Sequence, residues 1–158
     1  MKNNLYKIFL FFSCILLFNC GFKVLDKSQI NNFSIQKILT SGDRKINFKI
    51  KNYLLTSVST DNQKRLIINL NTKKNKIIKE KNIKNEIMKY EISLTIKTTF
   101  NFVNDDNLES FSITSVGDFL VGGNYLNTLN NEKKLIDNLV NDLSKKIINK
   151  ISLQLNDI

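Results

Sequence analysis

Cys20 is the residue whose type and position most clearly imply a chemical reaction. It follows an apolar run of eleven residues, Ile8 to Phe18, and the segment before that run, Met1 to Lys7, carries two lysines and no acid. A basic n-region followed by an apolar h-region is the layout of a secretory signal. Residues 1–19 therefore predict export of the chain, with Cys20 at the processing position.

The segment that ends in Cys20 resembles the lipobox of bacterial lipoproteins, with Leu17 three residues before the cysteine. The resemblance implies that Cys20 becomes the first mature residue and carries a diacylglyceryl group and an amide-linked acyl chain. An ordinary cleaved signal and an uncleaved anchor are the alternatives, although a spanning helix needs about 20 apolar residues. Cys14 is a rival acylation site that leaves only six residues after Lys7 for the apolar region.

No catalytic constellation is visible in the sequence. The chain has no histidine, and both cysteines lie at or before the processing site. The adjacent carboxylates of Asp105 and Asp106 could serve acid–base chemistry, but Asn104 and Asn107 flank them, and this composition predicts a hairpin turn. We therefore expect no enzyme, no metal site and no cofactor other than the covalent lipid on Cys20.

Lysines gather between Lys73 and Lys89, where seven lysines stand against two glutamates. Four isoleucines lie among them: Ile77, Ile78, Ile83 and Ile87. Charge and apolar contact together would suit a phosphorylated or carboxylated glycolipid, since each lysine near an anionic membrane contributes about 1 kcal/mol. The alternative is a solvated surface segment enriched in lysine by codon bias. Because the segment falls between two predicted strands, we expect it to project as an extended hairpin or as a loop with strand-like arms.

The whole chain has a formal net charge of +10. Such a charge favours polyanions, among them nucleic acid, anionic lipid and lipopolysaccharide. Export argues against nucleic acid, so an anionic glycolipid is the better prediction.

The first elements of the mature chain should be a strand and a helix. Phe33, Ile35 and Leu39 alternate with polar residues and predict a strand over 33–40. Ser41 or Asp43 then offers a helix N-cap. Over residues 44–57 an apolar stripe at a spacing of four predicts an amphipathic helix, with Tyr53 and Leu55 widening the stripe formed by Ile46, Ile50, Leu54 and Val58.

Three strands and a long helix should follow. In residues 64–72 one face holds Leu66, Ile68 and Leu70, with Ile67 on the other, and residues 90–102 alternate apolar and polar throughout. Residues 108–120 predict a partner strand, with Phe111 and Ile113 facing inward. From Leu135 to Leu155 an apolar stripe predicts the C-terminal helix, with acidic residues toward its start and lysines toward its end, as the helix dipole favours.

These elements predict an α+β fold in which two helices pack on one face of a four-stranded, mainly antiparallel sheet. The predicted organisation is a signal peptide at 1–19, a lipidated connection at 20–32 and one domain at 33–158.

The mature N-terminus resembles a known family. The segment Cys20-Gly21-Phe22-Lys23-Val24-Leu25 is similar to the start of LptE-type lipopolysaccharide-assembly lipoproteins, and the order strand, helix, three strands, long helix is the same as theirs. Residues 121–155 resemble the alphaproteobacterial branch of that family.

The resemblance implies a lipoprotein anchored at the periplasmic face of the outer membrane. It would plug the LptD β-barrel, help that barrel assemble and assist lipopolysaccharide transport to the outer leaflet. The first candidates for lipopolysaccharide phosphate would be Lys73, Lys74, Lys76 and Lys79. A lipid-anchored periplasmic adaptor of another envelope complex, with a protein partner only, is the alternative, and a lipid-anchored hydrolase is a third.

Overall fold

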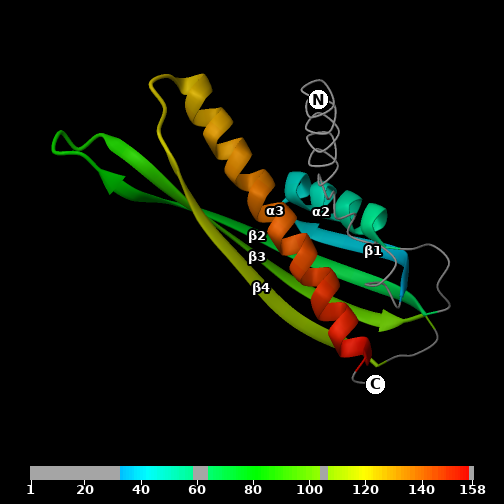
Figure 1. Cartoon of the computed structure of the whole chain (residues 1–158). Helices are drawn as coiled ribbons and strands as arrows, with labels where there is room; N and C mark the ends of the chain where they lie inside the picture. The colour runs from blue at the N-terminus through cyan, green and yellow to red at the C-terminus, as the bar shows by residue number, and fades with distance from the viewer. Residues whose placement is uncertain (1–32, 59–63, 104–106, 157–158) are drawn as a thin grey trace, which may run out of the picture.

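Two helices lie on one face of a four-stranded sheet in the computed structural model, which describes residues 33–58, 64–103 and 107–156 (Figure 1). The elements in chain order are β1 (Ser34–Gly42), α2 (Arg44–Ser57), β2 (Arg65–Lys81), β3 (Ile87–Phe102), β4 (Glu109–Leu120) and α3 (Tyr125–Asn156). The strand order is β1-β2-β3-β4, with β1 parallel to β2 and the other pairs antiparallel. The predicted α+β architecture is confirmed. The predicted signal and connection at 1–32 lie outside the described residues.

α2 connects the two parallel strands, because parallel neighbours need a crossover and this helix supplies it. Of the two N-cap candidates, Asp43 is the cap: its Oδ1 accepts hydrogen bonds from the backbone N–H groups of Lys45 at 3.0 Å and Ile46 at 3.1 Å. Ser41 instead accepts a hydrogen bond at its backbone carbonyl from the side-chain amide of Asn47. The predicted stripe on α2 is buried, but Leu55 is exposed and does not widen it.

The alternation predicted for β1 is wrong at one position. Phe33 is buried as expected, but Leu39 is 46% exposed and its neighbour Ile38 is only 7% exposed. The pairing register between β1 and β2 shifts between Ile35 and Lys37. Because side chains alternate faces along a strand, one extra residue moves every later side chain to the opposite face.

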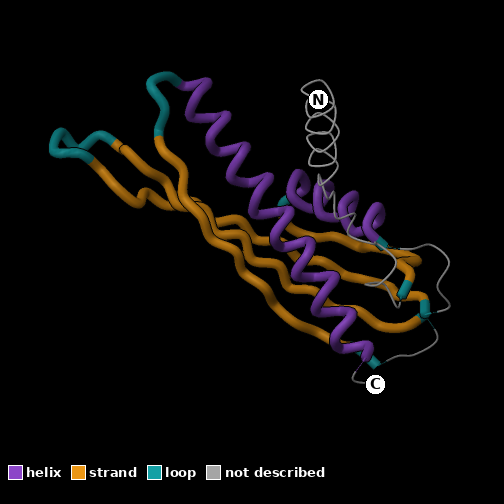
Figure 2. Tube along the Cα trace, in the orientation of Figure 1, coloured by secondary structure: helices purple, strands orange, loops and turns teal. Residues whose placement is uncertain are grey.

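The sheet turns one apolar face toward the helices, as the alternation of residues 90–102 predicts. Its buried side chains are Leu66, Ile68 and Leu70 on β2 and Ile92, Leu94, Ile96 and Phe100 on β3. On β4, Phe111 is buried and Ile113 packs against the core. No helix of the described residues covers the opposite face of the sheet (Figure 2).

α3 begins ten residues before Leu135, the first residue of its predicted apolar stripe. The stripe is buried from Leu139 onward and closes the core at Leu155. The prediction that charged residues complement the dipole of this helix is wrong. The first turn of α3 contains no acidic residue, and the last turn contains no basic residue. Asp137 and Asp142 lie in the middle of the longer helix instead, too far from its end for the dipole to act.

The helices divide the sheet between them: α2 packs over β1 and β2, and α3 packs over β4 and β3. They contact each other as well, and an ion pair between Lys49 and Asp137 joins them. Beyond this contact, two parts of the chain project from the two-layer body: the N-terminal half of α3, and the hairpin where β2 ends and β3 begins. Their tips point in different directions (Figures 1 and 2).

Candidate functional site

The lysine-rich segment forms a hairpin, here called the basic hairpin (residues 73–89), as the sequence predicts. β2 runs through it to Lys81, and β3 starts at Ile87. Asn82 closes the turn: its side-chain oxygen accepts hydrogen bonds from the backbone N–H groups of Lys84 and Glu86, both at 2.9 Å. Asn85 adopts a positive φ of 64°, a conformation that asparagine tolerates better than most residues.

The four candidate lysines lie on two faces of the sheet. Lys74 pairs with Leu94 across the β2–β3 ladder, and both side chains point toward the helices. Lys76 does the same opposite Ile92. Lys73 pairs with Thr95 and points to the uncovered face, because neighbouring residues of a strand alternate sides. The four lysines therefore do not form one site.

On the helix side, Lys74 and Lys76 are engaged by α3. The Glu132 carboxylate lies 2.6 Å from the Nζ atom of Lys76 and 3.9 Å from that of Lys74. The Lys76 ammonium also lies 4.4 Å from the ring centre of Tyr90 and 5.1 Å from that of Phe119, within reach of a cation–π interaction. These contacts tie the basic hairpin to the N-terminal half of α3.

On the uncovered side, Lys79 is also paired. Its Nζ lies 3.2 Å from the Glu91 carboxylate and 3.4 Å from that of Asp118. The hydrogen bond to Glu91 is the largest effect on the pKa of Lys79 and raises it; burial opposes this rise, and the hydrogen bond to Asp118 adds to it. Lys73 forms no ion pair with any residue the structure describes. It is the one candidate of the four whose charge is available to a ligand.

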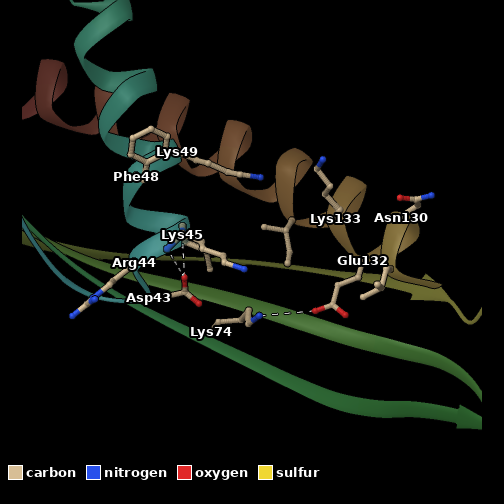
Figure 3. Close-up of a pocket in the computed structure, with 12 residues that line it drawn as sticks. Asp43, Arg44, Lys45, Phe48, Lys49, Lys74, Asn130, Glu132 and Lys133 are labelled. Atoms are coloured by element: carbon tan, nitrogen blue, oxygen red, sulfur yellow. Dashed lines mark hydrogen bonds and ion pairs between the residues drawn. The ribbon is translucent and has the colours of Figure 1, made fainter. Parts of the chain in front are cut away.

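A groove that the sequence did not predict lies beside these residues. This groove, of about 780 Å³, lies between the start of α2, the β2 strand at Lys74 and the N-terminal half of α3 (Figure 3). Its apolar lining comes from Ile46, Phe48, Leu129 and Ile136. We call it the α2–α3 groove.

Two exposed apolar side chains stand out in the lining of the α2–α3 groove. Phe48 is 66% exposed and Leu129 is 42% exposed. Phe48 lies off the apolar stripe of α2, between Asn47 and Lys49. A large apolar residue on the polar side of a helix is the feature of the sequence that could have indicated an exposed binding surface here.

Basic side chains outnumber acidic ones around the α2–α3 groove by five to two. Both acids are engaged: Asp43 caps α2, and Glu132 pairs with lysines of the basic hairpin. Arg44, Lys45 and Lys133 form no ion pair with a described residue. In Figure 3 the Lys45 side chain extends into the space between the two helices, whereas Arg44 points away from it.

No cluster of metal-binding side chains occurs within residues 33–58, 64–103 and 107–156. Within the same ranges, neither helix combines the length and the apolar character that crossing a membrane requires. Cys20, the predicted lipidation site, lies outside the described residues, so its modification stays a prediction.

The fold, two helices on a four-stranded mixed sheet, is one found in solved bacterial lipoproteins. The chain is similar to the rare lipoprotein B of Shewanella oneidensis, with a TM-score of 0.58 and 13% identity over 76% of this chain and 97% of that one. A lipoprotein B of Nitrosomonas europaea matches with a TM-score of 0.56 and 12% identity over 82% and 90%.

A putative lipoprotein of Caulobacter crescentus matches with a TM-score of 0.55 and 9% identity over 76% of this chain and 90% of that one. At these identities the likeness establishes the fold. No family model and no curated protein sequence matches the chain.

Proposed function

We propose that this protein is a lipoprotein of the LptE type, anchored at the periplasmic face of the outer membrane through acylated Cys20. In this role it plugs an LptD-type β-barrel, helps the barrel assemble and assists lipopolysaccharide transport to the outer leaflet. The observation that carries the proposal is the fold, which is shared with solved lipoproteins over most of the chain and occurs behind an N-terminus that predicts lipidation. No catalytic step is part of this function.

The uncovered face of the sheet supports a plug role. It carries polar side chains along its central strands, among them Asn69, Asn71, Thr95 and Thr99, which alternate with the buried residues. The interior of an outer-membrane barrel is polar, so a face of this composition suits a barrel lumen better than a lipid environment. Lys73 lies on the same face and is the candidate for contact with a lipopolysaccharide phosphate there.

Affinity isolation of the tagged, full-length protein from detergent-solubilised envelopes tests the proposed function. We expect a large β-barrel protein to be recovered in near-equal amount. Recovery with other envelope proteins and no barrel would favour the adaptor alternative, and recovery of the protein alone would contradict both partner proposals.

Metabolic labelling with a fatty acid tests the anchor separately. Cys20→Ser should abolish acyl labelling and retain the signal or release the protein from the membrane, because the acceptor sulfur is lost. Cys14→Ser is the matched control and should leave labelling unchanged. Continued labelling of the Cys20→Ser variant would identify Cys14 as the acceptor instead.

A further inference from the structure

We infer that the α2–α3 groove binds one molecule of an anionic glycerophospholipid, with the head-group phosphate at Lys45 and Lys133 and an acyl chain against Phe48 and Leu129. The inference rests on the lipid anchoring in the proposed function, which keeps the groove beside a phospholipid leaflet. It does not depend on the barrel or on lipopolysaccharide.

Charge complementarity is the first argument for an anionic ligand. Lys45 and Lys133 come from two different helices and both line the same hollow, and neither has a carboxylate partner among the described residues. The two acids of the lining cannot neutralise them without leaving existing contacts, since Asp43 caps α2 and Glu132 lies 2.6 Å from Lys76. A phosphate group would supply the missing negative charge.

The apolar lining is the second argument, because it excludes a free phosphate ion as the preferred ligand. Phe48 and Leu129 belong to different helices, and both expose large apolar surfaces into the same hollow. Apolar area exposed to water in this way is unfavourable relative to burial. An acyl chain lying between Phe48 and Leu129, over Ile46 and Ile136, would remove that area from water.

The size of the groove favours a glycerophospholipid over lipid A, the phosphorylated part of lipopolysaccharide. A volume of about 780 Å³ lies within the range that holds a single drug-sized ligand. The head group of a glycerophospholipid and part of one of its acyl chains fit this scale. A glycerophospholipid would leave one acyl chain outside the groove, whereas lipid A would leave several chains and a disaccharide in water, so the glycerophospholipid is the better fit.

Photocrosslinking in the full-length, lipidated protein, purified in detergent without a barrel, tests the inference. The probe is phosphatidylglycerol with a photoactivatable group in one acyl chain. We expect crosslinked peptides from residues 43–49 and 129–136, and competition by unlabelled phosphatidylglycerol but not by phosphatidylcholine of the same chain length.

A pair of matched double variants tests the role of charge. Lys45→Gln with Lys133→Gln should weaken phosphatidylglycerol binding about thirtyfold, from the contribution of each lysine near an anionic lipid. Lys51→Gln with Lys145→Gln removes the same net charge from exposed positions that do not line the groove, and it should leave binding nearly unchanged.

A second variant keeps the test valid if a charge variant is poorly folded. Leu129→Asn should weaken binding of the long-chain probe but leave binding of a short-chain phosphatidylglycerol unchanged, because only the chain contact is lost. Circular dichroism and the thermal midpoint report on folding of every variant.

Three results would overturn the inference: equal weakening by both double variants, crosslinks outside the groove peptides, or displacement of the probe by lipid A at lower concentration than by phosphatidylglycerol. The first reduces binding to overall charge, and the last assigns the groove to lipopolysaccharide. Failure to recover a barrel contradicts only the proposed function, because crosslinking is measured without one.

Discussion

Lys76 should contribute more to stability than any other lysine of the basic hairpin, because its ammonium makes three contacts at once. It lies 2.6 Å from the Glu132 carboxylate and over the rings of Tyr90 and Phe119. A partly exposed ion pair contributes about 0.2–1 kcal/mol, and a cation–π contact at an exposed site contributes about 0.5–1 kcal/mol. We therefore expect Lys76→Met to lower the free energy of unfolding by about 1–2 kcal/mol.

Urea unfolding of the purified protein measures this loss as a lower midpoint with an unchanged m-value. Lys73→Met is the matched control, three residues away on the uncovered face and without an ion pair to a described residue. It should change the free energy of unfolding by less than about 0.5 kcal/mol.

A double-mutant cycle isolates the ion pair from the ring contacts. Lys76→Met and Glu132→Gln should be coupled by about 0.5–1 kcal/mol, because either change alone already removes the pair. If Lys76→Met costs no more than Lys73→Met, or if the coupling is zero, the reasoning is refuted and the basic hairpin is not held to α3 through Glu132.

Two further predictions concern single positions. A hydrogen bond from Lys146 lowers the pKa of Asp142, so the stabilisation is present at neutral pH and is lost as the pH falls through that lowered pKa. Asp142→Asn should therefore lower the free energy of unfolding by up to about 0.5 kcal/mol at pH 7, a small value because the pair is exposed. At strongly acidic pH the same substitution should have no effect. An equal loss at both pH values in urea titrations would contradict the pairing. Gly42 has a φ of +92°, and a Cβ there would lie 1.9 Å from the backbone oxygen of Thr72. Gly42→Ala should lower the free energy of unfolding by about 3 kcal/mol or more, measured by thermal or urea unfolding. Gly123→Ala is the control and should change it little, because a Cβ at Gly123 meets no atom within 4 Å. Similar losses for the two variants would show that the backbone at Gly42 is not constrained.

Much of the fold could be predicted because burial leaves a periodic record in the sequence. The alternation of residues 90–102 gives β3 and its buried face, and the spacing of Ile46, Ile50 and Leu54 gives α2 and its buried stripe. Each of these elements has one apolar face, and a two-layer packing is the economical way to cover such faces. Where periodicity is broken by one residue, as at the bulge between Ile35 and Lys37, the prediction of the buried residue fails.

The start of α3 could not be placed from its apolar stripe. Tyr125, Leu126 and Leu129 form the first turns but are exposed, so they do not continue the buried pattern that identified the helix from Leu135. A helix segment that projects beyond the sheet has no core contact to select apolar residues at a helical spacing.

From the sequence alone the export signal and the acceptor thiol of Cys20 are predictions, and both lie outside the described residues. The basic hairpin and the faces of most elements could be predicted because each depends on residues that are neighbours in the chain. Only the tertiary structure decided which charges are available. It pairs Lys76 and Lys79 with acids from other elements, leaves Lys73 without such a partner among the described residues, and brings residues 43–49 and 129–136 together in one groove. The physical reason is that Coulomb attraction and groove shape depend on distances in space, and the packing of α2 and α3 on the sheet sets those distances between segments some 80 residues apart.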